Sequence, residues 1–239
     1  MQKFIKLSLI FLATVTSLHA QLILFYENEK AGYKNASEDV IIKAIYDAGS
    51  DFKNGMAVVM NNGKRGFINE EGTEIIALQY DDASQFCEGL AKVALGKNYG
   101  YINVKGETVI PFIFSFGEDF KNGIALVSKN NLFGFINAAG EEVIPCIYES
   151  AQNFSSGLAA AKLNGKWGFI SFEGKTIVDF KYDNAFPFSK GKARVEKGND
   201  ILIISVTGKI LKKTEKEKPG EENEEEEFKQ TLKIKIKQK

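Results

Sequence analysis

Residues 164–182, NGKWGFISFEGKTIVDFKY, contain two glycine-centred turns that separate short apolar segments. Asn164-Gly165 is a dipeptide that commonly joins the two strands of a β-hairpin. After it, Trp167 and Phe169 occupy alternate positions, which is the side-chain period of a strand. Gly174 then introduces a further apolar segment. The stretch therefore predicts a β-hairpin followed by a third strand.

This stretch is one copy of a repeat with a period of 34 residues. The motif Phe-x-x-Gly-x-Ala begins at Phe52, Phe86, Phe120, Phe154 and Phe188. The motif Gly-aromatic-Ile-Asn begins at Gly66, Gly100 and Gly134, and again at Gly168, where Ser171 replaces the Asn. An aromatic column, usually followed by Asp or Glu, contains Tyr46, Tyr80, Phe114, Tyr148 and Tyr182. Four complete units span residues 52–187.

A 34-residue period is also that of helical tetratricopeptide repeats, so the content of each unit decides the class. Glycines fall inside the apolar pattern, where a helix would lose ~1 kcal/mol for each of them. The segments are short, rich in Val, Ile, Phe and Tyr, and bounded by turn residues. We predict an all-β fold of tandem 34-residue repeats with about three antiparallel strands each. Such repeats form a curved array, either an open arc or a closed, propeller-like ring.

The ends of the array are incomplete in sequence. We assign residues 21–51 to an N-terminal partial repeat, because residues 32–47 match the second and third strands of a unit. Residues 188–211 form a degenerate C-terminal partial repeat, in which Leu202 replaces the motif glycine. The low-complexity, charged residues 212–239 are predicted to be a mostly disordered tail. Within this tail, residues 231–237 alternate Leu or Ile with Lys, the pattern of a strand that could dock on a sheet edge.

The sequence NGKWGFISFEGKTIV, with FSSGLAAAKL just before it, resembles the bacterial WG repeat family, also called KWG repeats. The resemblance covers roughly residues 32–211. It implies an exported or surface bacterial repeat protein from a family without an established common activity. Only one copy here has Trp-Gly; the others have Arg65-Gly66, Tyr99-Gly100 and Phe133-Gly134.

Residues 1–20 have the composition of a secretory signal peptide. Lys3 and Lys6 precede an apolar segment, residues 7–15, and a small-residue region that ends at Ala20. The apolar segment is much shorter than the ~20 residues of a membrane span. We expect cleavage near Ala20 and export to the periplasm, the medium or the cell surface, with no transmembrane segment in the mature chain.

Composition restricts the possible chemistry. Cleavage would remove His19, the only histidine, which excludes catalytic triads and His-ligated zinc from the mature chain. The whole chain has 31 basic and 31 acidic residues, a balance that gives no field for attracting nucleic acid. We expect Cys87 and Cys146 to be two buried small residues rather than a disulfide, because they lie nearly two periods apart.

The column that contains Trp167 is the best candidate for a binding site. Its members are Arg65, Tyr99, Phe133 and Trp167. Because a fully buried position would rarely accept Arg, we place this column at a partly exposed rim. One interpretation is a packing ladder; the other is a row that stacks on sugars or grips a peptide. The first-strand positions Val58, Lys92, Leu126, Ala160 and Arg194 vary freely, which predicts an exposed or half-exposed face.

The carboxylates show no catalytic or metal-binding constellation. Glu118-Asp119 could contribute to a calcium site, and a pair of carboxylates could hydrolyse glycosides, but no ligand-spaced motif is present. We therefore expect no catalytic residues, no metal and no cofactor. The resulting hypothesis is a non-enzymatic binding or scaffold protein that interacts with an envelope or extracellular protein. The alternative is a glycan- or peptidoglycan-binding module, and a carboxylate hydrolase is the third possibility.

Overall fold

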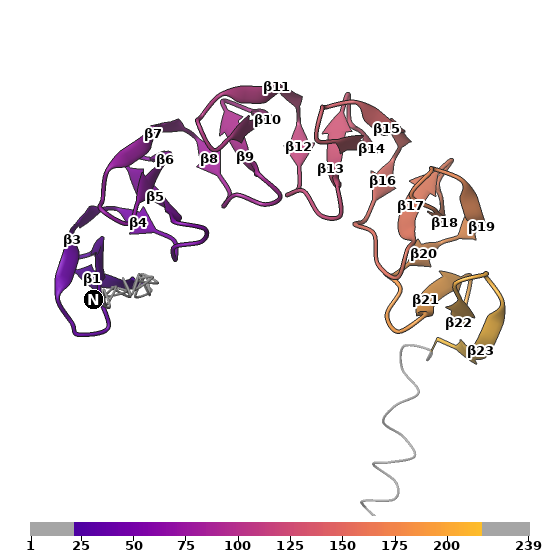
Figure 1. The fold of residues 1–239 in the computed structure, drawn as a ribbon. Coiled ribbons are helices and arrows are strands. Elements are labelled where there is room, and N and C mark those ends of the chain that lie inside the picture. Colours follow the sequence, from indigo (N-terminus) through magenta and orange to yellow (C-terminus); the bar gives the residue numbers. More distant parts are fainter. Residues whose placement is uncertain (1–21, 217–239) are drawn as a thin grey trace, which may run out of the picture. The chain divides into compact units, whose positions relative to one another are not determined.

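The computed structural model describes residues 22–216, so the predicted signal peptide and residues 217–239 of the predicted tail lie outside it. The described residues form 23 strands in six antiparallel sheets and no helix, which confirms the all-β prediction (Figure 1). The chain divides after Gln79 into two compact units. Each sheet is open: among the described residues, its two edge strands each pair with a neighbour on one side only.

The first sheet has three strands in the order β1-β2-β3, and each of the others has a short strand followed by three long ones. The first sheet consists of β1 (Ile23–Glu27), β2 (Lys30–Lys34) and β3 (Val40–Tyr46). The second consists of β4 (Ala48–Gly49), β5 (Met56–Asn61), β6 (Lys64–Asn69) and β7 (Glu74–Tyr80). The third consists of β8 (Asp82–Ala83), β9 (Leu90–Leu95), β10 (Asn98–Asn103) and β11 (Thr108–Phe114).

The remaining three sheets lie in the second unit and repeat the same order. The fourth consists of β12 (Phe116–Gly117), β13 (Ile124–Lys129), β14 (Leu132–Asn137) and β15 (Glu142–Tyr148). The fifth consists of β16 (Ser150–Ala151), β17 (Ala159–Leu163), β18 (Lys166–Ile170) and β19 (Thr176–Tyr182). The sixth consists of β20 (Asn184–Ala185), β21 (Lys192–Lys197), β22 (Asp200–Ser205) and β23 (Ile210–Glu215).

The structure differs from the predicted strand pattern in three places. Each complete unit contains a two-residue strand that sequence periodicity did not reveal, because two residues are too few to show alternation. The N-terminal repeat has its first strand, β1, which was not predicted. Strand β23 includes residues 212–215, which were assigned to the disordered tail, because these residues pair in register with β22 from Asp200↔Glu215 to Ile203↔Lys212.

The glycine of the Gly-aromatic-Ile-Asn motif lies where the backbone of the third strand comes closest to the backbone of the second strand. A Cβ atom on Gly134 would lie 2.6 Å from the Ile144 carbonyl oxygen and 2.7 Å from the Cys146 nitrogen. The β14–β15 register shifts on both sides of Phe135, so the absent side chain allows two irregularities in the pairing. In the sixth sheet, Leu202 pairs regularly with Lys213, which is why that copy does not need the glycine.

The Asn of the same motif stabilises the next turn. The Asn137 Oδ1 accepts hydrogen bonds from the backbone N–H groups of Ala139 and Glu141, both at 3.0 Å. Its Nδ2 donates to the Glu141 carboxylate at 2.8 Å. This is an Asx-type turn, in which the side chain substitutes for a backbone acceptor. The recurrence of Asn at this position is therefore explained by local structure.

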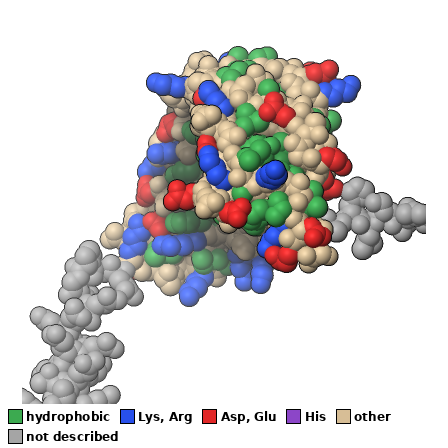
Figure 2. Space-filling model, turned by 90° about the vertical axis from the view of Figure 1, so that its left-hand side faces the viewer, with side chains coloured by type: hydrophobic (Ala, Val, Ile, Leu, Met, Phe, Trp, Pro, Cys, Tyr) green, Lys and Arg blue, Asp and Glu red, His purple; other side chains and the backbone are tan. Residues whose placement is uncertain are grey.

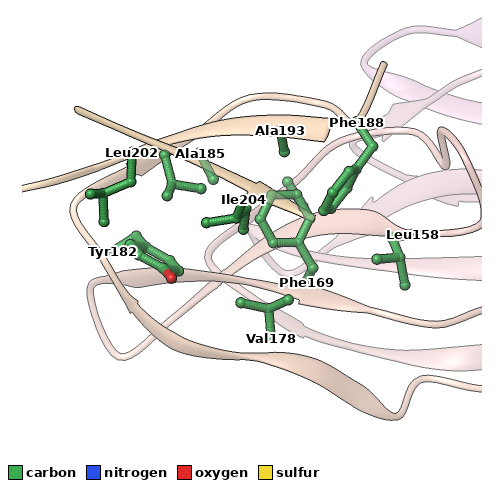
Figure 3. Close-up of a cluster of buried hydrophobic side chains, with 11 residues drawn as sticks. Leu158, Phe169, Val178, Tyr182, Ala185, Phe188, Ala193, Leu202 and Ile204 are labelled. Carbon is green, nitrogen blue, oxygen red and sulfur yellow. The ribbon is translucent and has the colours of Figure 1, made fainter. Parts of the chain in front are cut away.

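Within each unit, the hydrophobic core lies between successive sheets. The aromatic residue of one second strand packs against the motif Phe that precedes the next first strand. In the second unit, ring centroids are 5.0 Å apart for Tyr101–Phe120, 4.8 Å for Phe135–Phe154 and 4.7 Å for Phe169–Phe188. Figure 3 shows the last of these pairs enclosed by Leu158, Val178 and Ile204. In the second unit, the aromatic residue of the Gly-aromatic-Ile-Asn motif and the Phe of the Phe-x-x-Gly-x-Ala motif therefore form a series of ring pairs between successive sheets, which we call the inter-sheet ladder.

The first-strand face predicted to be exposed is mostly buried. Val58, Leu126 and Ala160 are covered, whereas Lys92 is half-buried and Arg194 is exposed. In the second unit, Leu126 packs with residues of the next sheet such as Ala159 and Ile170. Variation at this position reflects a different neighbour in each sheet. In the last described sheet, Arg194 donates to the Glu196 carboxylate at 2.7 Å, which places charged groups on that face.

Candidate functional site

The four predicted site residues lie at equivalent places on four second strands. Arg65 lies on β6 in the first unit, and Tyr99, Phe133 and Trp167 lie on β10, β14 and β18 in the second. All four side chains are half-buried. Each aromatic residue thus presents part of its ring to solvent while the rest packs on the sheet.

The neighbours of the three aromatic side chains differ. The Lys92 ammonium lies 5.4 Å from the Tyr99 ring centroid, within the range of a cation–π contact. The Phe133 ring lies 5.8 Å from that of Phe116. Trp167 packs against the cluster that contains Phe169 and Phe188. Among the described residues, no ring contact joins the three to one another, so the structure does not assemble them into one shared platform.

The acidic residue that follows the aromatic column binds the turn of the next hairpin. In four described hairpins, a carboxylate oxygen accepts a hydrogen bond from a turn N–H. The pairs are Asp47 with Asn62 at 2.7 Å, Asp81 with Gly96 at 2.7 Å, Glu149 with Gly165 at 2.9 Å, and Asp183 with Gly198 at 2.6 Å. We call these pairs the carboxylate clasps. The sequence signal for them is the acid found about 15 residues before each turn.

Asp183 illustrates the electrostatics of a clasp. A hydrogen bond from the Lys166 ammonium at 2.6 Å, followed by that from the Gly198 N–H, holds the pKa of Asp183 below its ordinary value. The same two causes, from Lys30 and Asn62, lower the pKa of Asp47. These carboxylates are therefore charged over most of the pH range and are committed to backbone and lysine partners. This is a structural role, not that of a general acid.

Stability should fall on acidification through these clasps. Because the folded-state pKa of Asp183 is depressed, its contribution is present above the unfolded-state pKa of about 3.9 and is lost as pH falls below that value. We expect Asp183→Asn to lower the melting temperature at pH 7, and the melting temperatures of the two proteins to converge as the pH falls through the depressed folded-state pKa of Asp183. As a control, Asp179→Asn, which removes only an exposed ion pair with Lys181, should leave the pH profile unchanged. A profile for Asp183→Asn parallel to the parent would contradict this assignment.

Cys87 and Cys146 are not disulfide-bonded and are both half-buried. They were expected to be buried, but Cys87 lies in the turn before β9 and Cys146 lies on β15, the last strand of its sheet, so part of each residue stays exposed. Burial, followed by the negative charge of Glu142, raises the pKa of the Cys146 thiol to about 11, although Lys129 acts in the opposite direction. The thiol is therefore protonated at neutral pH and a poor nucleophile.

The pH dependence of the alkylation rate measures the pKa of the Cys146 thiol. In a Cys87→Ser variant, which leaves one thiol, we expect iodoacetamide to modify Cys146 at pH 8 on the order of 100-fold more slowly than an unperturbed cysteine. The rate should rise about tenfold per pH unit until it levels near pH 11. Mass spectrometry of timed samples gives the rate. A plateau below pH 9 would show that Cys146 is not shielded in this way.

The remaining acidic candidates do not converge. The backbone carbonyl of Glu118 accepts a hydrogen bond from the Tyr101 hydroxyl at 2.8 Å, which ties this segment to β10. In the described part of the chain, no group of three or more His, Cys, Asp or Glu side chains is placed to hold a metal ion. None of residues 22–216 lies in a helix long and apolar enough to cross a membrane.

Comparison with known families agrees with this geometry. The model of the WG containing repeat matches five consecutive segments: residues 32–64, 66–99, 99–133, 133–167 and 167–199. The chain belongs to the WG-repeat family. The matched segments advance by the same 34-residue period that separates the buried aromatic pairs, so the family resemblance inferred from sequence is confirmed. A comparison with curated proteins found no match.

Several solved structures are similar to this WG-repeat chain in fold. A eukaryotic initiation factor is 13% identical, with a TM-score of 0.51 over 80% of this chain and 62% of that one. Kluyveromyces lactis Hsv2 is 10% identical, with a TM-score of 0.47 over 78% of this chain and 71% of that one. A Bacteroides caccae protein of unknown function is 15% identical, with a TM-score of 0.32 over 82% and 93% of the two chains. At these identities the likeness concerns the fold alone.

Proposed function

We propose that this WG-repeat protein is an exported, non-enzymatic binding or scaffold protein that contacts other proteins of the cell envelope. The observation that carries the proposal is a set of exposed apolar side chains repeated on the third strands. In the second unit, their exposed fractions are between 39% and 49%. They are Val109, Ile113, Val143, Ile147 and Ile177. Repetition of exposed apolar groups at fixed positions is typical of an interaction surface.

The third strands favour contact through side chains over the addition of another strand. Strands β11, β15 and β19 are each the last strand of their sheet. Pro111 and Pro145 lie at the same exposed position of β11 and β15, and neither has an N–H to donate to an added strand. Asp179 occupies this position in β19. A partner would therefore bind over the exposed Val and Ile side chains. Figure 2 shows exposed hydrophobic side chains between charged ones on one face of the molecule.

Export is supported by the composition of residues 1–20, with lysines before an apolar segment and small residues at its end. The proposed bacterial envelope location, periplasmic or at the surface, rests on this segment together with the resemblance to the bacterial WG repeat family. An N-terminal sequence determined for the protein purified from the producing cell should begin near Gln21. A sequence beginning at Met1 would argue against export by this route.

A glycan or peptidoglycan ligand is the second candidate. The observation that favours it is the half-exposed aromatic side chain on each of three second strands, Tyr99, Phe133 and Trp167. Sugars stack on such rings through their apolar faces. The Lys92 ammonium above Tyr99 would add a contact for an acidic sugar.

A pulldown separates the two candidates. The purified protein is incubated with insoluble peptidoglycan and, in parallel, with solubilised envelope proteins. For the scaffold we expect a defined protein to be retained, and retention to fall at least tenfold in a triple variant, Val109→Ser, Val143→Ser and Ile177→Ser. The matched control, Val104→Ser and Val206→Ser, changes equally exposed valines outside the third strands and should retain the partner.

A different result is expected if the ligand is a glycan. Retention on peptidoglycan that free sugar reverses, and that is lost when Tyr99, Phe133 and Trp167 are changed to Ala, would favour the glycan ligand. Circular dichroism must first show that this variant remains folded, because the three rings are half-buried. Retention in neither fraction would contradict both candidates.

A further inference from the structure

One hairpin in the second unit lacks the carboxylate clasp. The residue before β12, equivalent to Asp47, Asp81, Glu149 and Asp183, is Ser115. Its hydroxyl lies 3.3 Å from the Ser128 carbonyl oxygen and 3.4 Å from the Ser128 hydroxyl, so it faces the strand beneath the turn. A serine side chain is too short and carries no charge to replace the carboxylate.

The turn above it has the same backbone form as the clasped turn at Asn62 and Gly63. Asn130 and Asn131 have φ values of 53° and 63°, compared with 51° and 73° for Asn62 and Gly63. Both residues are exposed. In the described part of the chain, no acceptor is paired with either backbone N–H. The turn therefore presents the same donors that bind a carboxylate in four other hairpins.

The side chains around this turn suit an acidic ligand. Ser128 is the buried polar residue beneath the turn, with 3% of its surface exposed. It lies between Phe116 and Phe133, because it pairs with one in β12 and with the other in β14. Lys129 begins the turn, and its ammonium lies 3.8 Å from the Glu142 carboxylate, close to the limit for an ion pair. The site thus combines exposed amide donors, a cation and two half-buried rings.

We propose that this turn binds the carboxylate of an Asp or Glu side chain on a partner polypeptide, in the position that the chain's own carboxylates occupy in the other hairpins. The proposal rests on the proposed protein-binding function and names the chemistry of one contact. Backbone N–H groups and Lys129 bind the carboxylate, while Phe116 and Phe133 contact the apolar part of the ligand. Hydrogen bonds of this kind are stronger when the acceptor is charged.

The internal clasps indicate which peptide fits. Each acid that clasps a turn follows a tyrosine: Tyr46-Asp47, Tyr80-Asp81, Tyr148-Glu149 and Tyr182-Asp183. A short peptide containing Tyr-Asp, blocked at both ends, therefore carries the same acid beside an aromatic side chain that Phe116 and Phe133 can contact. The matched peptide with Asn in place of Asp has the same shape without the charge.

The test is an NMR titration of the backbone amides of the full protein with these two peptides and, separately, with acetate. We expect the Tyr-Asp peptide to shift the Asn130 and Asn131 signals with a dissociation constant on the order of 1 mM, a plausible strength for one small exposed contact. The Asn peptide should bind at least tenfold more weakly. Equal shifts with both peptides would overturn the proposal. If acetate shifts these signals as effectively as the peptide, the turn binds any small carboxylate, and the proposal of a polypeptide ligand is overturned.

Two variants test whether the unoccupied carboxylate position is the binding site. Ser115→Asp should form the clasp internally, abolish peptide binding and raise the melting temperature. The reverse change, Glu149→Ser, should expose the Gly165 N–H and create a second site whose signals shift with the Tyr-Asp peptide. Undiminished binding by Ser115→Asp would overturn the proposal. If the peptide does not bind but an envelope protein is still retained in the pulldown, the carboxylate site is contradicted and the proposed scaffold function is not.

Discussion

Replacement of Phe169 by alanine is expected to lower the free energy of unfolding by about 3–5 kcal/mol, the usual cost of a buried Phe→Ala change. Phe169 is fully buried and packs against Phe188 of the following segment, with ring centroids 4.7 Å apart. The substitution removes this contact and leaves a cavity between the fifth and sixth sheets (Figure 3). Because repeat arrays are stabilised by contacts between neighbours, the damage should concentrate in these two sheets.

Urea denaturation measures the total loss, and hydrogen exchange locates it. We expect amides of β18 and β22 to lose protection first, while those of β10 change little. Phe186→Ala is the control, because this ring is exposed and contacts Arg194 on the surface. It should cost less than about 1 kcal/mol. A similar loss for the two variants would mean that the ladder does not hold the sheets together.

Much of the fold was predictable because the 34-residue period makes each structural requirement visible in four or five copies. The Phe120, Phe154 and Phe188 column and the Tyr101, Phe135 and Phe169 column are both aromatic throughout, and their rings pair between successive sheets. All six rings are buried except that of Phe154, which is half-buried. Asn103 and Asn137 recur because each satisfies donors in its own turn. These are local or adjacent contacts, so a repeated sequence pattern reports them well.

Other features depend on contacts that a single column does not show. Leu126 and Lys92 occupy the same position, yet one is covered and the other half-buried, because the residues opposite them differ. The clasp between Asp81 and Gly96 joins residues 15 apart in separate elements. Neither residue alone indicates the other. The candidate site was predictable only in part: the column of Arg65, Tyr99, Phe133 and Trp167 is half-buried as expected, but Ser115 and the turn at Asn130 were missed.

The absence of the acid at Ser115 was nevertheless visible in the sequence. The aromatic column continues through Phe114, and only the residue after it breaks the pattern. A departure from a repeat is informative once the role of the repeated residue is known. Here that role became clear only from the hydrogen bonds of the other four copies, which is why the turn could not be recognised beforehand.

Gly134→Ala should destabilise the fourth sheet by about 3 kcal/mol or more, although it adds a single methyl group. The new Cβ would lie 2.6–2.7 Å from three backbone atoms of β15, and backbone atoms cannot rotate away as a side-chain end can. Insertion into a tightly packed region typically costs ~1–3 kcal/mol, and a clash with the main chain lies at or above the upper end. The β14–β15 pairing must shift, so near-ultraviolet circular dichroism and urea denaturation should both change.

The matched control is Gly165→Ala. Nothing lies within 4 Å of its Cβ position, so only the backbone cost at a φ of +75° remains, about 1–2 kcal/mol. The comparison separates close approach from backbone conformation, since both changes add the same methyl group to the same kind of hairpin. If Gly134→Ala costs no more than Gly165→Ala, the β15 backbone can move aside. The constancy of the motif glycine would then need another cause, and the regular pairing of Leu202 in the sixth sheet would be coincidental.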